Sequence, residues 1–594
     1  MMKRFISVLS LLYFTATFQA QVASKYTVSF ENAVHHEAQI KATFTNLKTD
    51  EVEFRMSRSS PGRYALHEFA KNVYNVMVTD GKGHILKATR PDPYSWHVKG
   101  QDGTINVSYT LFANHGDGTY AQVDETHAHL NMPATFMYVP ELSEQGMEVT
   151  FNVRKDLNWK VATQLKHEKG NTYYAQNLQY FMDSPTEISN YKRRSFKVGN
   201  QTINFVLHDD EATNEYFDQY FESVKKIVLQ EKEVFGELPN YDYGEYTFLA
   251  CYMPNVDGDG MEHRNSTIMT TTRSLAHGGI QENISTASHE FFHCWNVERI
   301  RPKSLEPFDF TRTNMSGELW FAEGFTNYYD ALTQCRTGIW SLEHYLKDMT
   351  RGFNYVWTSP GRQFFNIIQM SYKAPFVDAA TSIDDTNWEN TFISYYNYGE
   401  MLGLALDLSL REINLNLDDY MKLMWKNFGK RGKSYTVEDL KTTLVTYAGK
   451  EFGDKFFSNY IYKSGMPDYK KLFRTVGINL TVNESKVSFG AEVRYQKIMD
   501  NPRIGTTAYL AGFQKGDKIL KIGGFTLNDL VTLDMVLDKY KVDDKVMVMF
   551  QRYNKIKEVE VSLKTEKLYD LSLMDADSTT GKMVQNRAFW LHLK

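Results

Sequence analysis

Two histidines and a glutamate in the stretch His289-Glu290-Phe291-Phe292-His293 have the spacing of a metal-binding helix. Residues four apart lie one turn above each other on an α-helix, so His289 and His293 can turn both imidazoles toward one metal ion while Glu290 lies beside it. A catalytic zinc ion takes three protein ligands and keeps one position open, where the pKa of a bound water falls to about 7. Glu290 is then placed to activate that water by accepting its proton and to pass the proton to a leaving amine. The pattern predicts a zinc hydrolase.

A third ligand must come from another element. Glu323 is our candidate, because it lies thirty residues after His293 in the apolar stretch 316–329, which has helical periodicity. Asn327, one turn further on, either hydrogen-bonds a ligand histidine from outside the metal shell or is a helix-surface amide. Cys294 follows His293 directly, but neighbouring helix positions point about 100° apart, so we interpret it as a buried structural thiol.

Two further helix bounds follow from local signals. Apolar residues recur at helical spacing after a start signal at Thr213 or Asn214, and Gly236 closes that element. The metal-binding helix is expected to begin with Ser285 as its cap and to run through Trp295.

The composition limits the possible functions. With 594 residues, of which 42% are hydrophobic, the chain is long enough for several folded domains. A formal net charge of -5 gives no basic patch, which argues against a nucleic-acid partner. The three cysteines, Cys251, Cys294 and Cys335, allow at most one disulfide, so the fold cannot depend on a disulfide framework.

The first twenty residues have the pattern of a secretory signal peptide. Lys3 and Arg4 precede an apolar run from Phe5 to Phe18, and Ala20 stands before the expected cut. The alternative is an N-terminal membrane anchor, but the run is shorter than about 18 residues. We therefore expect export to the periplasm or cell envelope of a bacterium, with no integral membrane span in the mature chain.

Changes of pattern predict a multidomain α+β fold. Short alternating runs indicate a β-sandwich-like domain first, helical periodicity after Asp209 indicates a mixed α/β unit with a helical second half, and short strands return past Leu472. The stretch Ala508–Gly524 places a small helix, a tight turn and a strand in succession and resembles a PDZ domain. The expected parts are the signal peptide at 1–20, the β domain at 21–205, the zinc peptidase domain at 206–471, the PDZ-like domain at 472–565 and a C-terminal tail at 566–594.

The His289–His293 stretch and the later stretch around Glu323 together resemble the gluzincin class of peptidases, in which the second glutamate is the third zinc ligand. More narrowly, the chain resembles the glycyl aminopeptidase family of PDZ-containing metallopeptidases. The stretches that carry this resemblance are Ser60-Pro61-Gly62-Arg63-Tyr64, Gly260-Met261-Glu262-His263, Trp295–Pro302 and the PDZ-like unit. The resemblance covers essentially the whole mature chain and implies a thermolysin-like catalytic domain with one zinc ion per chain.

The resemblance also implies substrate-binding residues. Gly260-Met261-Glu262 corresponds to an exopeptidase motif in which the glutamate binds the free α-amino group of the substrate, and a carboxylate near the metal can pair with an ammonium. The alternative is that Glu262 is a surface charge after a glycine-rich turn. A tyrosine that stabilises the oxyanion is expected at Tyr396, with the adjacent Tyr395 as the alternative.

These expectations favour a zinc-dependent aminopeptidase that hydrolyses the first peptide bond of peptides with a small first residue, glycine or alanine. One alternative is an envelope endopeptidase whose PDZ-like domain recruits peptide or protein C-termini, since PDZ domains bind peptides at a sheet edge. The nearest candidate for a carboxylate-binding loop there is Ser488-Phe489-Gly490. A further alternative is a PDZ binding protein without catalysis. A measurement of zinc content would distinguish it from a zinc enzyme.

Overall fold

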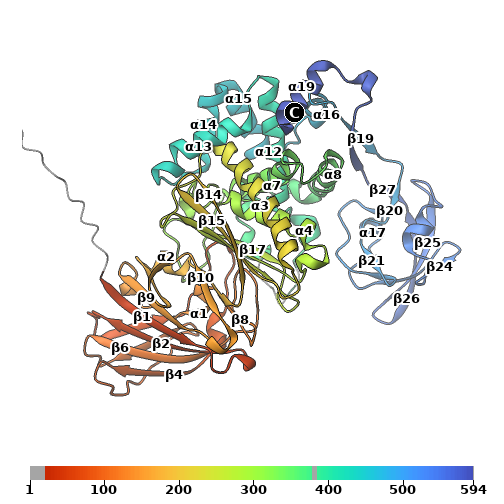
Figure 1. Ribbon diagram of the computed structural model, residues 1–594. Helices are drawn as coiled ribbons and strands as arrows, with labels where there is room; N and C mark the ends of the chain where they lie inside the picture. The colour runs from red at the N-terminus through yellow and green to blue at the C-terminus, as the bar shows by residue number, and fades with distance from the viewer. Residues whose placement is uncertain (1–20, 378–383, 385, 593–594) are drawn as a thin grey trace, which may run out of the picture.

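A computed structural model describes residues 21–377, 384 and 386–592 and confirms a multidomain α+β fold (Figure 1). The signal peptide expected at residues 1–20 lies outside the described residues. Within the described ranges, no helix combines the length and the apolar character that a membrane span requires.

The N-terminal unit consists of two β-sheets that share one hydrophobic core. Val28 and Ile40 contribute to that core from the larger sheet, and Ala128 and Ile188 contribute from the smaller one. The larger sheet has the strand order β11 (Lys166–Lys169), β12 (Thr172–Ala175), β9 (Gly146–Asn152), β1 (Val22–Ser29), β2 (Glu37–Thr45), β6 (Thr104–Phe112) and β4 (Val73–Asp80). The smaller sheet has the order β10 (Lys160–Thr163), β13 (Thr186–Ser189), β8 (His127–Leu130) and β7 (Gln122–Val123).

A five-stranded mixed sheet opens the second unit. Its order is β14 (Lys192–Val198), β15 (Gln201–His208), β16 (Glu245–Tyr252), β18 (Ser266–Thr271) and β17 (Asp259–His263). The second unit therefore begins near Lys192 and not at 206, because β14 and β15 form a hairpin that joins this sheet through β16. The strand β17 lies at the edge of the sheet.

Helices cover this sheet and form the second half of the unit. Helix α3 (Asn214–Phe235) begins after Thr213, whose side chain accepts from the Tyr216 amide, and ends at Gly236 in a left-handed conformation, as the sequence predicts. Helix α5 (Ile284–Phe292) differs from its predicted bounds. The Ser285 hydroxyl donates to Gln334 instead of capping the helix, and turns replace the helix after His293.

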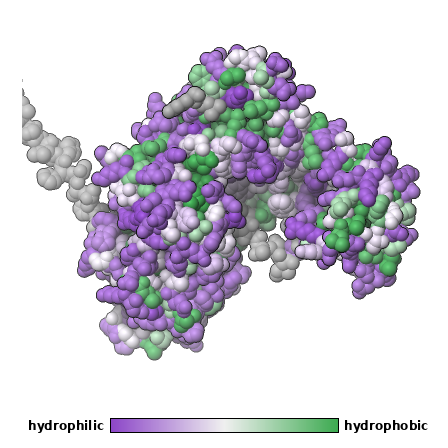
Figure 2. Space-filling model, turned by 45° about the vertical axis from the view of Figure 1, so that its right-hand side comes forward, coloured by the Kyte–Doolittle hydropathy of each residue, from purple (hydrophilic) through white to green (hydrophobic). Residues whose placement is uncertain are grey.

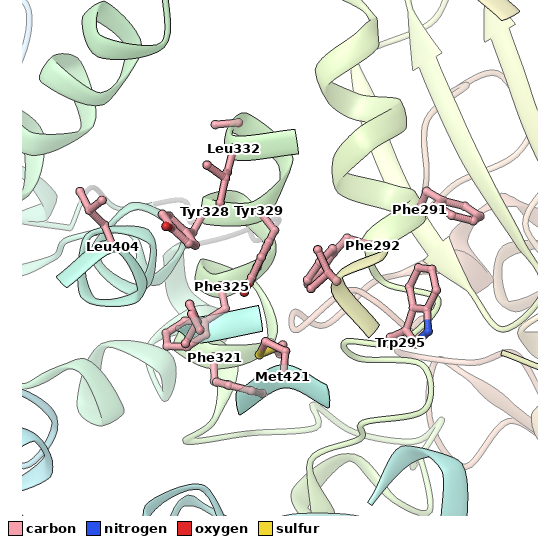
Figure 3. Close-up of a cluster of buried hydrophobic side chains, with 14 of the residues drawn as sticks. Phe291, Phe292, Trp295, Phe321, Phe325, Tyr328, Tyr329, Leu332, Leu404 and Met421 are labelled. Atoms are coloured by element: carbon pink, nitrogen blue, oxygen red, sulfur yellow. The ribbon is translucent and has the colours of Figure 1, made fainter. Parts of the chain in front are cut away.

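Helix α5 packs between the sheet and helix α7 (Gly324–Arg336). The Phe292 ring stacks on Tyr329 at a centroid distance of 4.7 Å (Figure 3). On the other side of the helix, Phe291 stacks on Phe248 of β16. The aromatic residues on both faces thus fix the rotation of α5 about its axis.

The expected single helix over 316–329 is divided into α6 (Leu319–Ala322) and α7, with Glu323 between them. Helix α12 (Tyr395–Glu412) crosses this junction at very short range. A Cβ atom on Gly399 would lie 2.1 Å from the carbonyl oxygen of Trp320, and one on Gly324 would lie 2.4 Å from the Cα of Gly399. The two glycines therefore allow the start of α12 to approach Glu323.

The PDZ unit has a core of its own, formed by residues such as Ile498, Val536 and Val548. Figures 1 and 2 show it as a separate lobe beside the helical half of the second unit. Its main elements are α17 (Thr507–Leu510), β23 (Lys518–Ile522), α18 (Leu533–Leu537), β25 (Lys545–Arg552) and β26 (Lys555–Ser562).

The residues expected to form a C-terminal tail are ordered instead. Strand β28 (Leu568–Leu573) pairs with β19 (Ile478–Asn483), and helix α19 (Gly581–Leu591) follows. Trp590 on α19 is buried, and its indole N–H donates to the Tyr328 hydroxyl at 2.9 Å. The chain thus returns from the PDZ unit to the second unit, because burial of this tryptophan and the new strand pair both stabilise that return.

Candidate metal centre

Three side chains from two elements converge on one point. The Nε2 atoms of His289 and His293 are 3.1 Å apart, and Oε2 of Glu323 lies 3.6 Å from the first and 3.3 Å from the second. Helix α5 supplies His289 and its C-cap residue is His293, and the break between α6 and α7 points the glutamate at them. Two imidazole nitrogens and one carboxylate oxygen, turned toward each other in a largely buried site, are a donor set that fits a zinc ion.

Outer partners determine which nitrogen of each histidine faces that point. His289 Nδ1 donates to Asp330 Oδ2 at 3.2 Å, and His293 Nδ1 donates to the backbone oxygen of Asn296. Both acceptors lack a hydrogen, so each Nδ1 carries the proton and each Nε2 keeps a lone pair for a metal. Asp330 has the part that sequence reasoning assigned to Asn327, which lies instead beside the Glu400 carboxyl group. Asn327 and Asp330 are one helical turn apart, and helical periodicity in the sequence does not show which of them faces His289.

Tyr64 comes to the site from the N-terminal unit. Its hydroxyl donates to Glu323 Oε1, which leaves Oε2 for the two histidines. In the sequence, Ser60–Tyr64 contributes to the family resemblance but indicates no role for these residues. The clue was its final tyrosine, because a buried hydroxyl needs a partner and a metal-ligating carboxylate has an oxygen to spare.

The same stretch supports the edge strand β17. Arg63 forms an ion pair with Asp259 at the start of that strand. Gly62 has a left-handed φ of 79°, and a Cβ there would lie 2.0 Å from Met261 Sδ and 2.9 Å from Glu262 Oε2. Met261 is buried, so its side chain packs against Gly62.

Glu262 and Glu290 lie together beside the three converging groups. A carboxylate oxygen of each lies within 4.8 Å of the other and of a ring nitrogen of His293. Glu262 is 6% exposed, so it is not a surface loop charge. Gly260 leaves room for Glu290, because a Cβ at that position would lie 2.2 Å from Glu290 Oε1. In the stretch Gly260-Met261-Glu262, the glycine thus leaves space for Glu290, and the glutamate places a second carboxylate beside it.

The crowding of carboxylates changes their acidity. Burial, with the negative charges of Glu262 and Glu323 nearby, raises the pKa of Glu290 to about 7. Burial and the charges of Glu323 and Glu298 likewise raise the pKa of Glu262 to about 7. A dication at this point would favour the charged form of every carboxylate around it. The acidic surroundings therefore favour cations, both a metal and an ammonium group.

Tyr396 lies next to the histidines. Its ring is 6.0 Å from that of His289 and is partly exposed, whereas Tyr395 is 1% exposed and its ring lies 6.3 Å from Tyr64. Both tyrosines reach the site, and Tyr396 is the one beside a candidate metal ligand and open to solvent.

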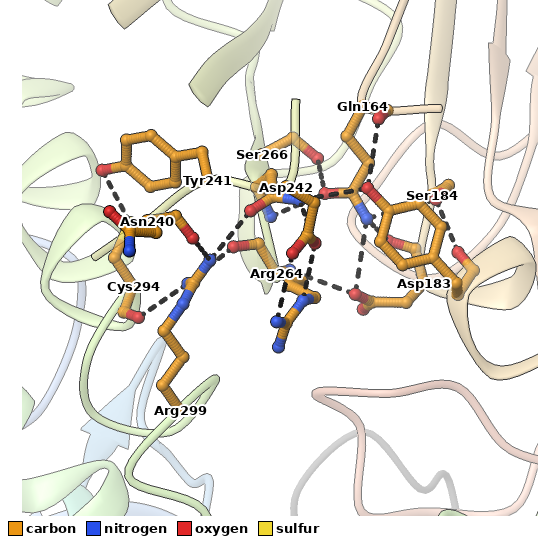
Figure 4. Close-up of polar contacts among 12 residues, drawn as sticks. Gln164, Asp183, Ser184, Asn240, Tyr241, Asp242, Arg264, Ser266, Cys294 and Arg299 are labelled. Carbon is orange, nitrogen blue, oxygen red and sulfur yellow. Dashed lines mark hydrogen bonds and ion pairs between the residues drawn. The ribbon is translucent and has the colours of Figure 1, made fainter. Parts of the chain in front are cut away.

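Arg299 fixes the loop that follows the metal-binding helix. Its guanidinium donates to the backbone oxygens of Cys294 and Arg264, at 2.9 and 2.8 Å, and to Asn265 Oδ1 at 2.8 Å (Figure 4). It is thereby buried in a structural network between that loop and the turn from β17 to β18.

Comparisons with known proteins identify the domains of the chain. The Peptidase M61 N-terminal domain matches residues 25–190, the M61 glycyl aminopeptidase domain matches 282–402, and a PDZ domain matches 475–563. A crystal structure of an aminopeptidase N family protein from Idiomarina loihiensis is similar over 94% of this chain and 100% of its own, with a TM-score of 0.84 and 23% identity, and shows the same fold. An M1 zinc metallopeptidase from Deinococcus radiodurans aligns with 76% of this chain and 95% of its own at a TM-score of 0.45 and 12% identity.

Among curated proteins, a candidate zinc metalloprotease of Staphylococcus aureus is 48% identical over 61 residues. The match spans 10% of this chain and 14% of the length of that protein. With both M61 domains and the PDZ domain present in the expected order, the chain belongs to the glycyl aminopeptidase family of PDZ-containing zinc metallopeptidases.

Proposed function

We propose that this protein is a zinc-dependent aminopeptidase that removes the first residue of peptides with a free amino terminus. The observation that carries the proposal is the position of Glu262, a buried carboxylate next to His293 and Glu290. His289, His293 and Glu323 would hold one zinc ion. When bound there, zinc polarises the scissile carbonyl and lowers the pKa of a water molecule.

The surrounding side chains have separate parts in the reaction. Glu262 pairs with the α-ammonium of the substrate, which places the first peptide bond at the reacting centre. Glu290 takes a proton from the attacking water and delivers it to the leaving amine nitrogen. Tyr396 donates a hydrogen bond to the oxygen that becomes negative during the attack. The glycyl aminopeptidase family match supports a preference for a small first residue, glycine or alanine.

The PDZ unit supports the endopeptidase alternative less well. A groove of about 480 Å³ lies between Ser488–Gly490 and the start of α18. It is lined by four acidic residues and two basic ones, and the basic Arg503 is paired with Glu566. Such a groove repels the carboxylate of a peptide C-terminus. PDZ binding of peptides is therefore secondary in our proposal.

The test compares a short peptide beginning with alanine with the same peptide acetylated at its amino terminus. Wild-type protein should cleave the free peptide and leave the acetylated one intact. Glu290→Gln should reduce kcat for the free peptide by about 10²-fold or more, because the base is lost. Glu262→Gln should reduce kcat/KM for the free peptide at least about 30-fold, the equivalent of about 2 kcal/mol of charge pairing.

Two results would contradict the proposal in different ways. Equal cleavage of both peptides by the wild type would favour an endopeptidase. Full activity in Glu290→Gln would exclude the proposed mechanism.

A further inference from the structure

A second cluster of possible metal ligands, which shares no residue with the first, lies in the contact between the N-terminal unit and the five-stranded sheet. It consists of His127, Glu187, His208 and Cys251, all 4% exposed or less. None of these residues takes part in the proposed reaction. Burying two imidazoles, a carboxylate and a thiol together is costly unless the polar atoms have partners.

Strand pairing brings these four residues together. In the smaller sheet of the N-terminal unit, β13 pairs with β8 so that Glu187 is opposite His129, two residues from His127 and on the same face. In the five-stranded sheet, β15 pairs with β16 so that His208 is directly opposite Cys251. Each of the two units thus contributes two ligand candidates to the contact.

The donor atoms of His127, His208 and Cys251 converge almost as closely as those of the first cluster, and Glu187 Oε1 faces the two histidines. His127 Nδ1 and His208 Nδ1 are 3.1 Å apart, and Cys251 Sγ lies 3.6 and 3.9 Å from them. Glu187 Oε1 lies 3.6 Å from His127 Nδ1 and 3.3 Å from His208 Nδ1. Metal bonds of 2.0 to 2.3 Å in a tetrahedral zinc site separate the ligand atoms by about 3.3 to 3.8 Å. The cluster therefore has nearly the required dimensions.

Hydrogen bonds leave a lone pair of His127 at the centre of the cluster. His127 Nε2 lies 3.0 Å from Gln122 Oε1, and the orientation of that amide follows from its nitrogen, which donates to the backbone oxygen of Asn255. In the neutral ring, His127 Nε2 must then carry the proton, so Nδ1 faces the cluster as an acceptor.

Glu187 gives an independent indication that the cluster suits a cation. Its Oε2 accepts from His129 Nδ1 at 3.2 Å. Its Oε1 is buried and makes no hydrogen bond within the described ranges 21–377, 384 and 386–592, although it points at the two histidines. This buried oxygen lies 3.3 Å from His208 Nδ1 and 3.6 Å from His127 Nδ1 without a well-formed hydrogen bond, and a metal ion between the rings and the thiol would satisfy it.

We propose that His127, His208, Cys251 and Glu187 bind a second metal ion that connects the N-terminal unit to the five-stranded sheet. Two nitrogens, one sulfur and one oxygen favour zinc, and four protein ligands close the coordination shell, so the ion has a structural role. One apolar cluster at this contact is small and consists of Ala162, Tyr191, Val206 and Leu249. A metal link would add to the attachment of the two units.

Cobalt substitution of the full chain tests the proposal. Metal-free protein is titrated with Co²⁺ while its near-ultraviolet spectrum is recorded, because a cobalt–thiolate bond gives a charge-transfer band that histidine and carboxylate ligands do not give. The first cluster contains no thiol, so that band reports the second site. We expect two bound metals per chain and the band in the wild type.

Variants assign the band to its ligand. Cys251→Ser should lose the band, whereas Cys294→Ser is the matched control and should keep it. The double substitution His289→Ala with His293→Ala should remove one metal and keep the band. A folded wild type that binds one cobalt without the band would overturn the proposal, and so would a band that survives in Cys251→Ser. If Cys251→Ser fails to fold, the wild-type spectrum and the double variant still decide.

Discussion

The two histidine clusters of this protein use similar donors but are built in opposite ways. In the first, His289 and His293 lie one turn apart on a single helix, and Glu323 follows within the same unit. In the second, His127, His208 and Cys251 come from three strands in two units. A helix can present two ligands by itself, whereas strands need the assembled sheets to do so.

The surroundings differ as well. Glu262, Glu290 and Tyr396 stand beside the first cluster without being among its three converging ligands, so they can act on a substrate. Around the second cluster, Gln122 and His129 are outer partners of the four donors. The comparison teaches that the groups beside a metal site, and the number of its ligands, distinguish a reactive site from a structural one.

The largest effect is expected at Tyr396. Tyr396→Phe keeps the ring beside His289 and removes the hydroxyl, so kcat should fall roughly 10²- to 10³-fold with metal content unchanged. The matched control is Tyr395→Phe, which should change kcat only slightly. A large loss of kcat in Tyr395→Phe with no loss in Tyr396→Phe would show that Tyr395, and not Tyr396, is the oxyanion donor.

Gly260→Ala tests the steric support of the base. The new Cβ would lie 2.2 Å from Glu290 Oε1, so the carboxylate must move by about 1 Å, and kcat should fall roughly 100-fold. The melting temperature should change little, because the displaced group is the end of a flexible side chain. Gly258→Ala, two residues earlier and with nothing within 4 Å of its Cβ, is the control. Unchanged kcat in Gly260→Ala would show that the position of Glu290 is not critical.

Asp330→Asn should weaken metal binding at the first cluster without affecting the second. Loss of the carboxylate that holds His289 should lower zinc affinity about 10- to 100-fold, measured by competition with a chelator. Tyr64→Phe should act in the same direction through Glu323. If both affinities stay at the wild-type value, these residues do not support the metal site.

The pH profile should report the charge of Glu262. The pKa of Glu290 is raised first by burial and also by the Glu262 carboxylate, so Glu262→Gln should lower it. Activity is lost as pH falls through the pKa of the base, and the acidic limb of kcat/KM should therefore move to lower pH, by up to about one unit. A shift to higher pH would show that the two groups do not interact in this way.

The smallest effect on activity is expected at the second cluster. Cys251→Ser should leave kcat within about 2-fold of wild type, since no reacting group lies there, while the melting temperature falls as the metal link is lost. Heating followed by circular dichroism, with kcat measured below the transition, separates the two effects. A kcat loss as large as that of Tyr396→Phe would remove the distinction between a reactive and a structural site.

Much of this protein could be predicted from local patterns. The bounds of α3 follow from Thr213 and Gly236, because a cap and a left-handed glycine act within one turn of the chain. The approach of His289 to His293 follows from helix geometry alone. The order of the β-rich, catalytic and PDZ parts agrees with the domain matches.

Other features depend on contacts between distant segments. Only the assembled fold brings the hydroxyl of Tyr64 to Glu323, and only the crossing of α12 at Gly324 and Gly399 brings Tyr396 to the same place. The return of α19 to bury Trp590 beside Tyr328 is also a tertiary event.

By itself, therefore, the sequence determined the spacing of His289 and His293 on one helical turn, the order of the β-rich, catalytic and PDZ parts and the chemistry expected of Glu290. Tertiary structure decided which residues complete that site and that His127, His208 and Cys251 meet at all. The physical reason is the separation along the chain over which each kind of interaction acts. Backbone hydrogen bonding and helix geometry act over a few residues and leave a periodic trace, whereas the pairing of strands and the packing of units act between segments whose spacing in the sequence carries no period.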